Sequence, residues 1–280
     1  MGVTETRVSE RPPPAIVRDL REAYRRARAR FGHQHWWPAE TPFEVCVGAI
    51  LTQNTAWSNV ERALANLKRS GLLDPRRLFA LPEADLAELI RPAGYFRVKA
   101  RRLRAFLRVV VEECAGDLER LWRGPTPAVR ARLLEIPGVG PETADSMLLY
   151  AGGHEVFVVD AYTRRIFGRH GWYAGSPVWL QGLRGAASPA GPGAARATLP
   201  LPDRVGPALS YEALQALCQQ VLNHKRGPAR LDYWQDYHAQ LVMIGKHYCH
   251  ARQPRCEACP LRELLPRVVQ PGAVRNDRSP

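Results

Sequence analysis

Apolar residues recur at spacings of three and four along much of the chain, with polar residues between them. Six segments show this pattern: 15–31, 43–55, 58–70, 83–90, 97–114 and 126–136. Residues at these spacings fall on one face of an α-helix, and the proline or glycine between most segments ends one helix before the next begins. The pattern therefore predicts six helices.

The helical period returns in 208–222 and 231–247. One face of the last segment carries Leu231, Trp234, His238, Leu241 and Gly245. The one strand-like run, Val156 to Val159, is too short to form the basis of a sheet. The sequence therefore predicts an all-α fold.

Three segments lack the pattern. Residues 1–14 combine charge with three consecutive prolines, which cannot build a packed core, so they predict a disordered arm. Residues 174–207 are crowded with Gly, Ala and Pro and predict a flexible insertion between helices. Residues 266–280 are interpreted as a tail.

Charge indicates the class of partner. The 280 residues hold 40 Lys and Arg against 27 Asp and Glu, a net charge of +13, and 45% of them are hydrophobic. A globular protein with this excess of positive charge favours a nucleic-acid partner, although a basic surface without a partner is the alternative. No apolar run is long enough to span a bilayer, and the arm lacks the apolar core of a signal peptide. We therefore expect a cytoplasmic protein with no membrane partner.

A glycine turn joins two of the predicted helices. In LLEIPGVGPETADSM, Gly138 and Gly140 allow backbone conformations that a side chain would penalise, and Pro141 suits the first position of a new helix. The amides of Gly138, Val139 and Gly140 would lie at a helix N-terminus, where partial positive charge favours a phosphate oxygen. The alternative is an ordinary tight connection between helices.

A single carboxylate follows this turn. Asp160 ends the apolar run VFVVD and precedes a helix that begins AYTRRIF, so its simplest interpretation is a helix N-cap. The alternative is a catalytic carboxylate that stabilises positive charge on a sugar or activates a water. One residue can serve both purposes.

A basic stretch, GYFRVKARRLRAFLRVVV, has six positive residues and no acidic one between Pro92 and Val111. One face of the predicted helix carries Arg97, Arg101, Arg104 and Arg108. A charge run is usually a solvated face, but without acidic partners a stripe facing phosphates is at least equally well supported.

Three cysteines lie close together in CHARQPRCEAC. Cys249, Cys256 and Cys259 have the spacing C-x6-C-x2-C, and thiolates gathered this closely normally share a metal ion or an iron–sulfur cluster. The sequence leaves the fourth ligand open, and an empty loop is the alternative. The candidates are His247, His250, Glu263, Asp277 and the distant cysteines.

These four features, in the order that they take along the chain, resemble the endonuclease III family of DNA glycosylases in the helix-hairpin-helix superfamily. The resemblance runs from about Phe43 to Cys259, apart from the insertion. It implies two helical domains with DNA in the cleft between them. One would be a six-helix domain over 40–130, and the other would combine 15–39 with 131–265.

The resemblance also assigns roles to individual residues. Gln53, in ILTQNTAWSNV, would be the wedge that fills the gap left by a flipped nucleotide. GYFRVKA would be the lysine-containing turn, which places Lys99 with Arg97, Arg101 and Arg104 on the DNA backbone. Asp160 would be the catalytic aspartate, and the three cysteines would hold a [4Fe-4S] cluster. Tyr162 would either line the base pocket or pack beneath it.

Two positions depart from the family pattern. Glu142 stands where bifunctional members carry the lysine that forms a Schiff base with the sugar, and a carboxylate cannot form that imine. Without a substitute amine from Lys99, Lys246 or the N-terminus, strand cleavage is lost, and Glu142 either joins the pocket or only stabilises the helix N-terminus. Leu265 stands where the fourth cluster cysteine would be.

The resulting prediction is a monofunctional base-excision-repair DNA glycosylase. Acting as a monomer on double-stranded DNA, it would hydrolyse the N-glycosidic bond of a flipped damaged or mismatched base. Two alternatives stay open: a bifunctional glycosylase and lyase for oxidised pyrimidines, and a non-catalytic protein that binds damaged DNA. The sequence does not identify the lesion.

Overall fold

The computed structural model describes residues 13–172 and 210–266. The predicted insertion lies outside these ranges, as does nearly all of the predicted arm and of the predicted tail. Within them every regular element is a helix, so the predicted all-α fold is confirmed. The Val156–Val159 run is buried but pairs with no strand in this part of the chain.

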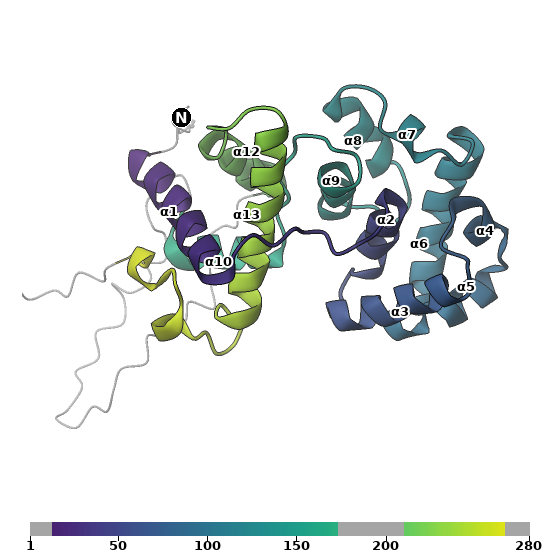
Figure 1. Ribbon diagram of the computed structural model, residues 1–280, viewed down its shortest axis with the longest axis horizontal. Coiled ribbons are helices and arrows are strands. Elements are labelled where there is room, and N and C mark those ends of the chain that lie inside the picture. The colour runs from purple at the N-terminus through teal and green to yellow at the C-terminus, as the bar shows by residue number, and fades with distance from the viewer. Residues whose placement is uncertain (1–12, 173–209, 267–280) are drawn as a thin grey trace, which may run out of the picture.

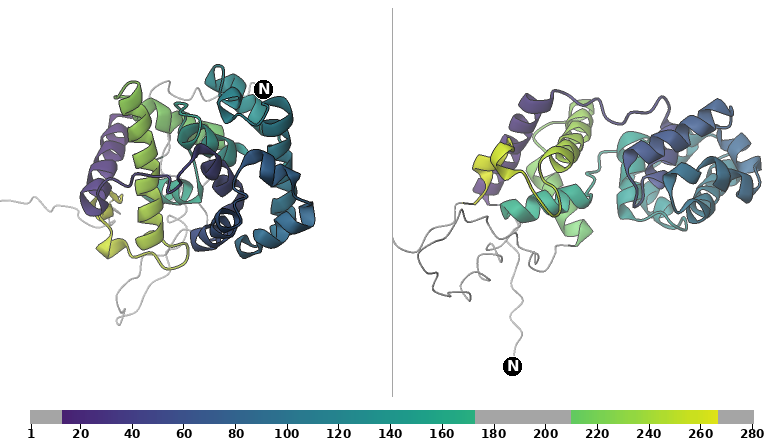
Figure 2. Two further views of the ribbon diagram at one scale, coloured as in Figure 1. Left: turned by 45° about the vertical axis from the view of Figure 1, so that its right-hand side comes forward. Right: turned by 90° about the horizontal axis from the view of Figure 1, so that it is seen from below.

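The helices form two lobes, which Figure 1 and Figure 2 show side by side. The first lobe contains α1 (Pro14–Phe31), α10 (Ala161–His170), α12 (Tyr211–Val221), α13 (Pro228–His247), η4 (Cys256–Ala258) and η5 (Arg262–Leu264). The second contains α2 (Pro42–Leu51), α3 (Trp57–Arg69), α4 (Pro75–Ala80), α5 (Glu83–Leu89), η1 (Arg91–Ala93), α6 (Phe96–Arg108), η2 (Val109–Glu113), α7 (Leu118–Leu121), α8 (Thr126–Leu134) and α9 (Pro141–Tyr150).

The chain passes between the lobes twice among the described residues. Residues 32–41, here called the linker, run from α1 to α2, and residues 151–160 return from α9 to α10 (Figure 1). The hairpin helices α8 and α9 therefore lie with α2 in the second lobe, whereas the sequence placed residues 131–150 in the other domain. The reason is burial: every side chain from Thr143 to Leu149 is buried, which fixes α9 at the centre of the molecule against α2 and α8.

Local sequence explains how several helices begin. Thr41 accepts a hydrogen bond from the Glu44 amide at 3.1 Å and caps α2, and Ser210 caps α12 in the same way. Proline occupies the first turn of α1, α2, α8, α9 and α13, where its missing N–H costs nothing. None of the helices in the described ranges has the length and apolar character needed to cross a bilayer.

Candidate active site

Asp160 lies where the returning segment enters α10. Its Oδ1 accepts a hydrogen bond from the Thr163 amide at 2.6 Å, so it caps the helix. The side chain is only 8% exposed, because the apolar run before it is buried. The predicted N-cap is therefore confirmed, and the second carboxylate oxygen remains free of the cap.

A histidine from another helix approaches that second oxygen, and a tyrosine from a third helix contacts the histidine. Nε2 of His238, on α13, lies 3.6 Å from Asp160 Oδ2. The hydroxyl of Tyr150, the last residue of α9, lies 2.6 Å from His238 Nδ1. Burial raises the pKa of Asp160, but interactions with His238 and the Thr163 amide outweigh it and leave the pKa below its usual value. Asp160 is therefore an anion at neutral pH.

Glu142 is a second carboxylate near Asp160, in the first turn of α9. Desolvation of the carboxyl group and the negative charge of Asp160 raise its pKa to about 7, although the residue as a whole is exposed. The two acids are thus shifted in opposite directions, which is the arrangement expected where one group stays ionised and the other carries a proton. Glu142 also lines a pocket of about 450 Å³, together with Gln53, Arg102 and Tyr211. Glu142 therefore lies both at the helix N-terminus and at the pocket, the two places to which its alternative predicted roles refer.

The glycine turn has the predicted course, but its two glycines differ. Gly138 has a φ of +91°, and a Cβ there would lie 2.3 Å from Cγ of Arg102. Gly140 has a φ of −94° and open space where a Cβ would stand, so the fold does not require a glycine there. The Val139 side chain is buried, and its amide donates to Ile136 O at 3.0 Å. The first turn of α9 has no side-chain cap, so whether its amides and the turn bind a phosphate stays a prediction.

Gln53 lies against this turn. Its Nε2 donates to Gly138 O at 3.0 Å and to Thr143 Oγ1 at 2.9 Å, and the Arg102 guanidinium donates to its Oε1. The structure therefore brings Gln53, the hairpin and Glu142 to one pocket. Whether Gln53 enters a duplex stays a prediction.

The basic helix α6 meets the prediction only in part. Arg97 and Arg101 are exposed, whereas Lys99 is 1% exposed and its Nζ donates to Leu51 O and Ala93 O, each at 2.8 Å. Burial, with a contribution from the Arg102 charge, lowers the Lys99 pKa to about 8. Arg104 donates to Leu81 O at 2.5 Å. Lys99 and Arg104 thus bind carbonyl groups of their own lobe, which corrects their expected place on the DNA backbone.

Tyr162 packs beneath the site. A Cβ on Gly245 of α13 would lie 2.0 Å from Cδ1 of Tyr162, so the ring fills the space above that glycine. The Arg165 guanidinium lies over the same ring, 5.0 Å from its centroid. The structure therefore places Tyr162 between α10 and α13.

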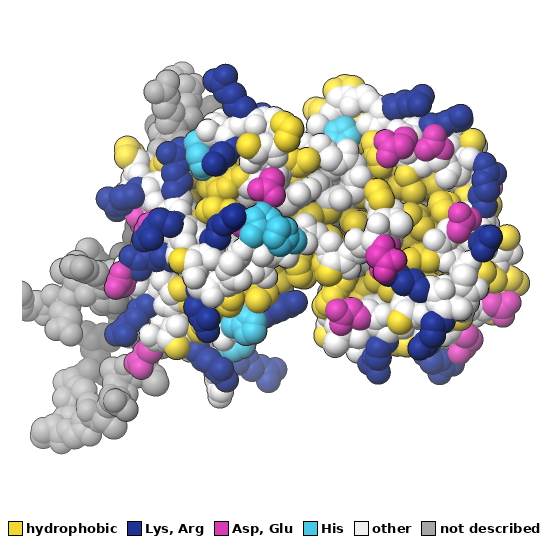
Figure 3. Space-filling model, in the orientation of Figure 1, with side chains coloured by type: hydrophobic (Ala, Val, Ile, Leu, Met, Phe, Trp, Pro, Cys, Tyr) yellow, Lys and Arg dark blue, Asp and Glu magenta, His cyan; other side chains and the backbone are white. Residues whose placement is uncertain are grey.

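An aromatic wall stands beside the site where the lobes meet, formed by Trp36, Trp37, Trp57 and Tyr150. Ring centroids of Trp37 lie 5.3 Å from Trp57 and 5.4 Å from Tyr150. The indole nitrogens of Trp36 and Trp37 are buried and have no hydrogen-bond partner among the described residues. Figure 3 shows apolar side chains gathered in the hollow between the lobes.

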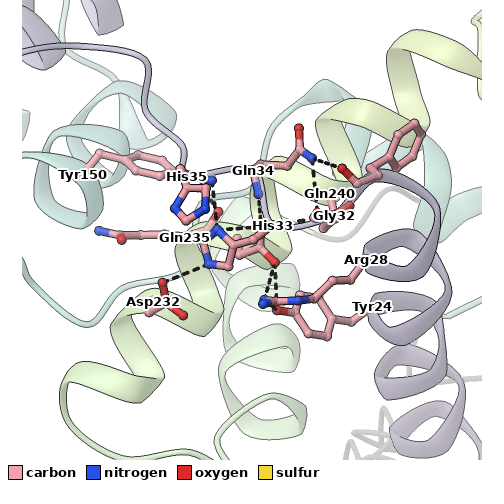
Figure 4. Close-up of polar contacts among 12 residues, drawn as sticks. Tyr24, Arg28, Gly32, His33, Gln34, His35, Tyr150, Asp232, Gln235 and Gln240 are labelled. Carbon is pink, nitrogen blue, oxygen red and sulfur yellow. Dashed lines mark hydrogen bonds and ion pairs between the residues drawn. The ribbon is translucent and has the colours of Figure 1, made fainter.

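The linker is anchored to α13, which holds the wall in place (Figure 4). The amide of Gln34 donates to Oδ1 of the buried Asp236 at 2.8 Å, and Nε2 of Gln240 donates to Gly32 O at 2.6 Å. His33 Nε2 lies 3.1 Å from Asp232 Oδ1. Two linker tryptophans are thereby fixed beside the helix that carries His238.

Sequence reasoning missed Arg102, Tyr150, Trp37 and the role of His238. The signal for Arg102 was its place in the basic run, one residue from a predicted backbone contact. Tyr150 and His238 are 88 residues apart, so no local pattern links them.

The cysteine loop packs on α10. The Arg169 guanidinium donates to Sγ of the buried Cys249 at 3.0 Å. Cys256 and Cys259 are half-buried, and burial together with the neighbouring thiols raises both pKa values. A raised pKa means that it is costly to ionise these thiols where they lie. Iron bound to the thiolates would offset this cost, because it would neutralise their charge.

The donor set fits three corners of an iron–sulfur cluster. No three His, Cys, Asp or Glu side chains in the described ranges are placed to share one metal ion. A four-iron cluster needs no such site, since each iron takes its own thiolate. Of the predicted fourth ligands, Glu263 is paired with Arg26 at 2.7 Å, the His247 ring packs on Phe31 at 5.6 Å, and Asp277 lies outside the described residues. Cys249, Cys256 and Cys259 would therefore hold the cluster.

Two family models match the chain. The model of the HhH-GPD superfamily of base excision DNA repair proteins matches residues 47–178. The model of the iron–sulfur binding domain of endonuclease III matches residues 249–264. The first match contains the hairpin and Asp160, and the second contains the three cysteines. The endonuclease III relatives and the second match support a [4Fe-4S] cluster at this loop.

Relatives cover most of the chain. One from Methanocaldococcus jannaschii, described as a candidate DNA repair glycosylase, is 39% identical over 236 residues, spanning 84% of this chain and 90% of the relative. Endonuclease III of Thermotoga maritima is 26% identical over 260 residues, 92% of this chain and 98% of that protein.

Solved structures share the fold. A non-covalent endonuclease III–DNA complex matches with a TM-score of 0.63 at 20% identity, covering 89% of this chain and 94% of that one. The H. pylori 3-methyladenine DNA glycosylase matches with a TM-score of 0.58 at 24% identity, covering 82% of this chain and 97% of that one. Both agree with an architecture of two helical domains.

Proposed function

We propose that this chain, which belongs to the HhH-GPD superfamily of base excision DNA repair proteins and is a DNA glycosylase of the endonuclease III type, releases its base by hydrolysis alone. The observation that carries the proposal is Glu142 in the first turn of the hairpin helix. A carboxylate there cannot attack the sugar to form the imine that precedes strand cleavage. The product would be an abasic site in an intact strand.

Asp160 would supply the main catalytic effect. As the N-glycosidic bond lengthens, the sugar acquires positive charge, and a buried anion beside it stabilises that charge strongly. The electron pair of the breaking bond passes to the base, water adds to the sugar carbon, and the departing base takes up the proton that this water loses. The hairpin amides would hold a backbone phosphate of one double-stranded DNA molecule, bound by a protein monomer.

The aromatic wall supports base flipping as the route to the site. A nucleotide turned out of the duplex would bring its base against the tryptophan rings, and stacking on such rings is favourable for any base. Gln53 would occupy the gap in the duplex. The wall does not discriminate among lesions, so a panel of damaged bases is needed to name the substrate.

The alternative of a bifunctional enzyme requires an amine that can attack the sugar, and two lysines among the described residues were predicted as substitutes. Lys99 is excluded as the nucleophile, because its ammonium is buried and bound to two carbonyl groups. Lys246 is exposed, and its Nζ lies 5.4 Å from the centroid of the Trp36 ring. Of these two lysines, Lys246 is therefore the one from which any residual lyase chemistry would be expected, and the N-terminal amine lies outside the described residues.

The test uses duplexes that each carry 3-methyladenine, thymine glycol, uracil or a G·T mismatch. Wild type, Asp160→Asn, Glu142→Gln and Lys246→Gln are incubated with each duplex, and strand breaks are scored with and without alkali. We expect breaks only after alkali, and we expect Asp160→Asn to abolish them while DNA binding is retained.

Each other outcome has a defined meaning. Breaks without alkali that need the protein would establish the bifunctional alternative and overturn the proposal; their loss in Lys246→Gln would assign the amine to Lys246, and their persistence would assign it to another amine. Tight binding of a damaged duplex with no base release from any member of the panel would instead support a non-catalytic protein that binds damaged DNA.

A further inference from the structure

His238 faces the catalytic carboxylate from α13, a helix that belongs neither to the hairpin nor to the segment that carries Asp160. Its ring is 5% exposed, and its Nε2 has no hydrogen-bond partner within the usual distance. The group nearest to this nitrogen that carries charge is Asp160 Oδ2, at 3.6 Å. A buried polar atom aimed at a catalytic oxygen without a hydrogen bond calls for an explanation.

The Tyr150 hydroxyl decides which ring nitrogen of His238 carries a proton. This hydroxyl has one proton and lies 3.1 Å from the carbonyl oxygen of Gln235 and 2.6 Å from His238 Nδ1. A carbonyl can only accept, so Tyr150 donates to Gln235. The contact with His238 is then a hydrogen bond only if Nδ1 donates. Tyr150 thereby assigns a proton to Nδ1 and fixes the ring.

The carboxylate decides the state of the other nitrogen. With Nδ1 protonated, a neutral ring would direct the bare lone pair of Nε2 at an anion, which is repulsive. A ring protonated at both nitrogens attracts the anion instead and offsets the cost of burying it. The geometry therefore favours an ion pair of Asp160 and the imidazolium of His238.

From this geometry we propose that His238, oriented by Tyr150, is a positioning residue that keeps Asp160 ionised and its Oδ2 aimed at the sugar. The inference rests on the proposed function, since it concerns the same carboxylate. The Thr163 amide holds one oxygen of Asp160, and His238 holds the other. A carboxylate held at both oxygens is already ordered before the sugar becomes charged, which is the condition for efficient electrostatic catalysis.

Other charged groups near His238 are accounted for. Glu142, from α9, acts on both His238 and Asp160. Asp236 lies on α13 itself, and its carboxylate is bound by Arg28 of α1 at 3.0 Å and by the Tyr24 hydroxyl at 2.8 Å. Tyr150 is partly buried, and desolvation of its hydroxyl raises its pKa well above its usual value, so it stays protonated. Of these groups, Asp160 is the carboxylate that lies within ion-pair distance of His238 Nε2.

Tyr150 also connects the site to the aromatic wall. Its ring lies 5.4 Å from Trp37 and 5.8 Å from His238, centroid to centroid.

The test measures single-turnover base release between acid and alkaline pH for wild type, His238→Gln and Tyr150→Phe. Released base is measured rather than strand breaks, so the result does not depend on whether a lyase step follows. His170→Gln is the matched control, because His170 is another buried histidine of the same lobe, hydrogen-bonded to Ile166 O at 2.8 Å. Thermal unfolding and affinity for an uncleaved duplex are recorded for each variant.

We expect His238→Gln to slow release at least about tenfold at neutral pH and to move the acid limb of the profile upward by about one pH unit. Without the imidazolium, burial raises the Asp160 pKa and the carboxylate is lost at a higher pH. Tyr150→Phe should give a smaller shift in the same direction, and His170→Gln no shift. A purely structural role would lower the rate equally at every pH.

An unchanged acid limb in His238→Gln would overturn the inference while leaving the glycosylase function intact. A second measurement, the titration of the Asp160 carboxyl carbon by NMR in wild type and His238→Gln, does not require activity. If wild type releases no base from any duplex but this titration shifts upward in the variant, the proposed function fails and the electrostatic link stands. If the titration does not shift, the inference fails.

Discussion

At the scale of single residues, the raised pKa of Glu142 has a consequence for stability. Its value of about 7 in the folded protein exceeds the ordinary 4.5, so the folded state binds a proton that the unfolded state has released. This contribution is present at pH 4.5 and is lost as the pH rises toward 7. We expect wild type to lose unfolding free energy from this group between pH 5 and pH 8, by less than the full shift implies, because the residue is exposed and solvent screens its charge.

Glu142→Gln should remove that loss, so the variant should be less sensitive to pH than wild type over the same range. Urea unfolding at pH 5 and pH 8 measures the difference. Glu135→Gln is the control, because Glu135 is exposed at the end of α8 and its substitution should leave the dependence unchanged. Equal slopes for wild type and Glu142→Gln would contradict the assigned environment of Glu142.

At the scale of elements, Lys99 ties three helices together. It lies in α6 and donates to the last residue of α2 and the last residue of η1, so it satisfies carbonyl groups left open where two helices end. Lys99→Met would leave two buried carbonyls unpaired, and we expect a loss of about 2–4 kcal/mol in unfolding free energy. Urea unfolding beside Arg101→Met, an exposed change on the same helix, checks this, and equal stability of the two variants would refute it.

Helix α6 also shows how far the sequence reaches. Periodicity predicts the helix and the residues that share its faces, because both follow from local geometry. It cannot tell which polar residue the fold will bury, since the partners of Lys99 are carbonyls of other helices. The same limit applies to the site. The sequence identified Asp160 from its place at the end of an apolar run, but it could not pair Tyr150 with His238, because these residues meet only through the packing of α9 and α13.

The sequence also predicted the glycine turn of the hairpin only in part. The motif located the hairpin and its helix N-terminus, but treated Gly138 and Gly140 alike. The difference between them arises from Arg102, whose side chain lies against Gly138 from α6. A contact between elements that are distant in sequence thus decides which glycine the turn requires.

At the scale of the whole molecule, net charge overstates the surface available to DNA. The chain carries +13, yet all six arginines of α1 contact groups within the protein. Arg18 pairs with Asp19, Arg25 and Arg26 with Glu22, and Arg28 with Asp236, while Arg21 and Arg30 donate to Val221 O and the Tyr248 hydroxyl. The exposed arginines of α6, in the lobe that carries the hairpin, are better placed to meet phosphates.

This difference predicts an asymmetric response to salt. Each phosphate contact contributes a slope of about −0.9 to the logarithm of the DNA association constant against the logarithm of salt concentration. The double variant Arg97→Gln/Arg101→Gln should therefore reduce the magnitude of the slope by about 2, and Arg25→Gln on α1 should leave it unchanged. Fluorescence anisotropy with an undamaged duplex over a salt series measures both. A larger change for Arg25→Gln than for the α6 pair would place the DNA on the opposite lobe and would overturn the assignment of the binding face to α6 and the hairpin.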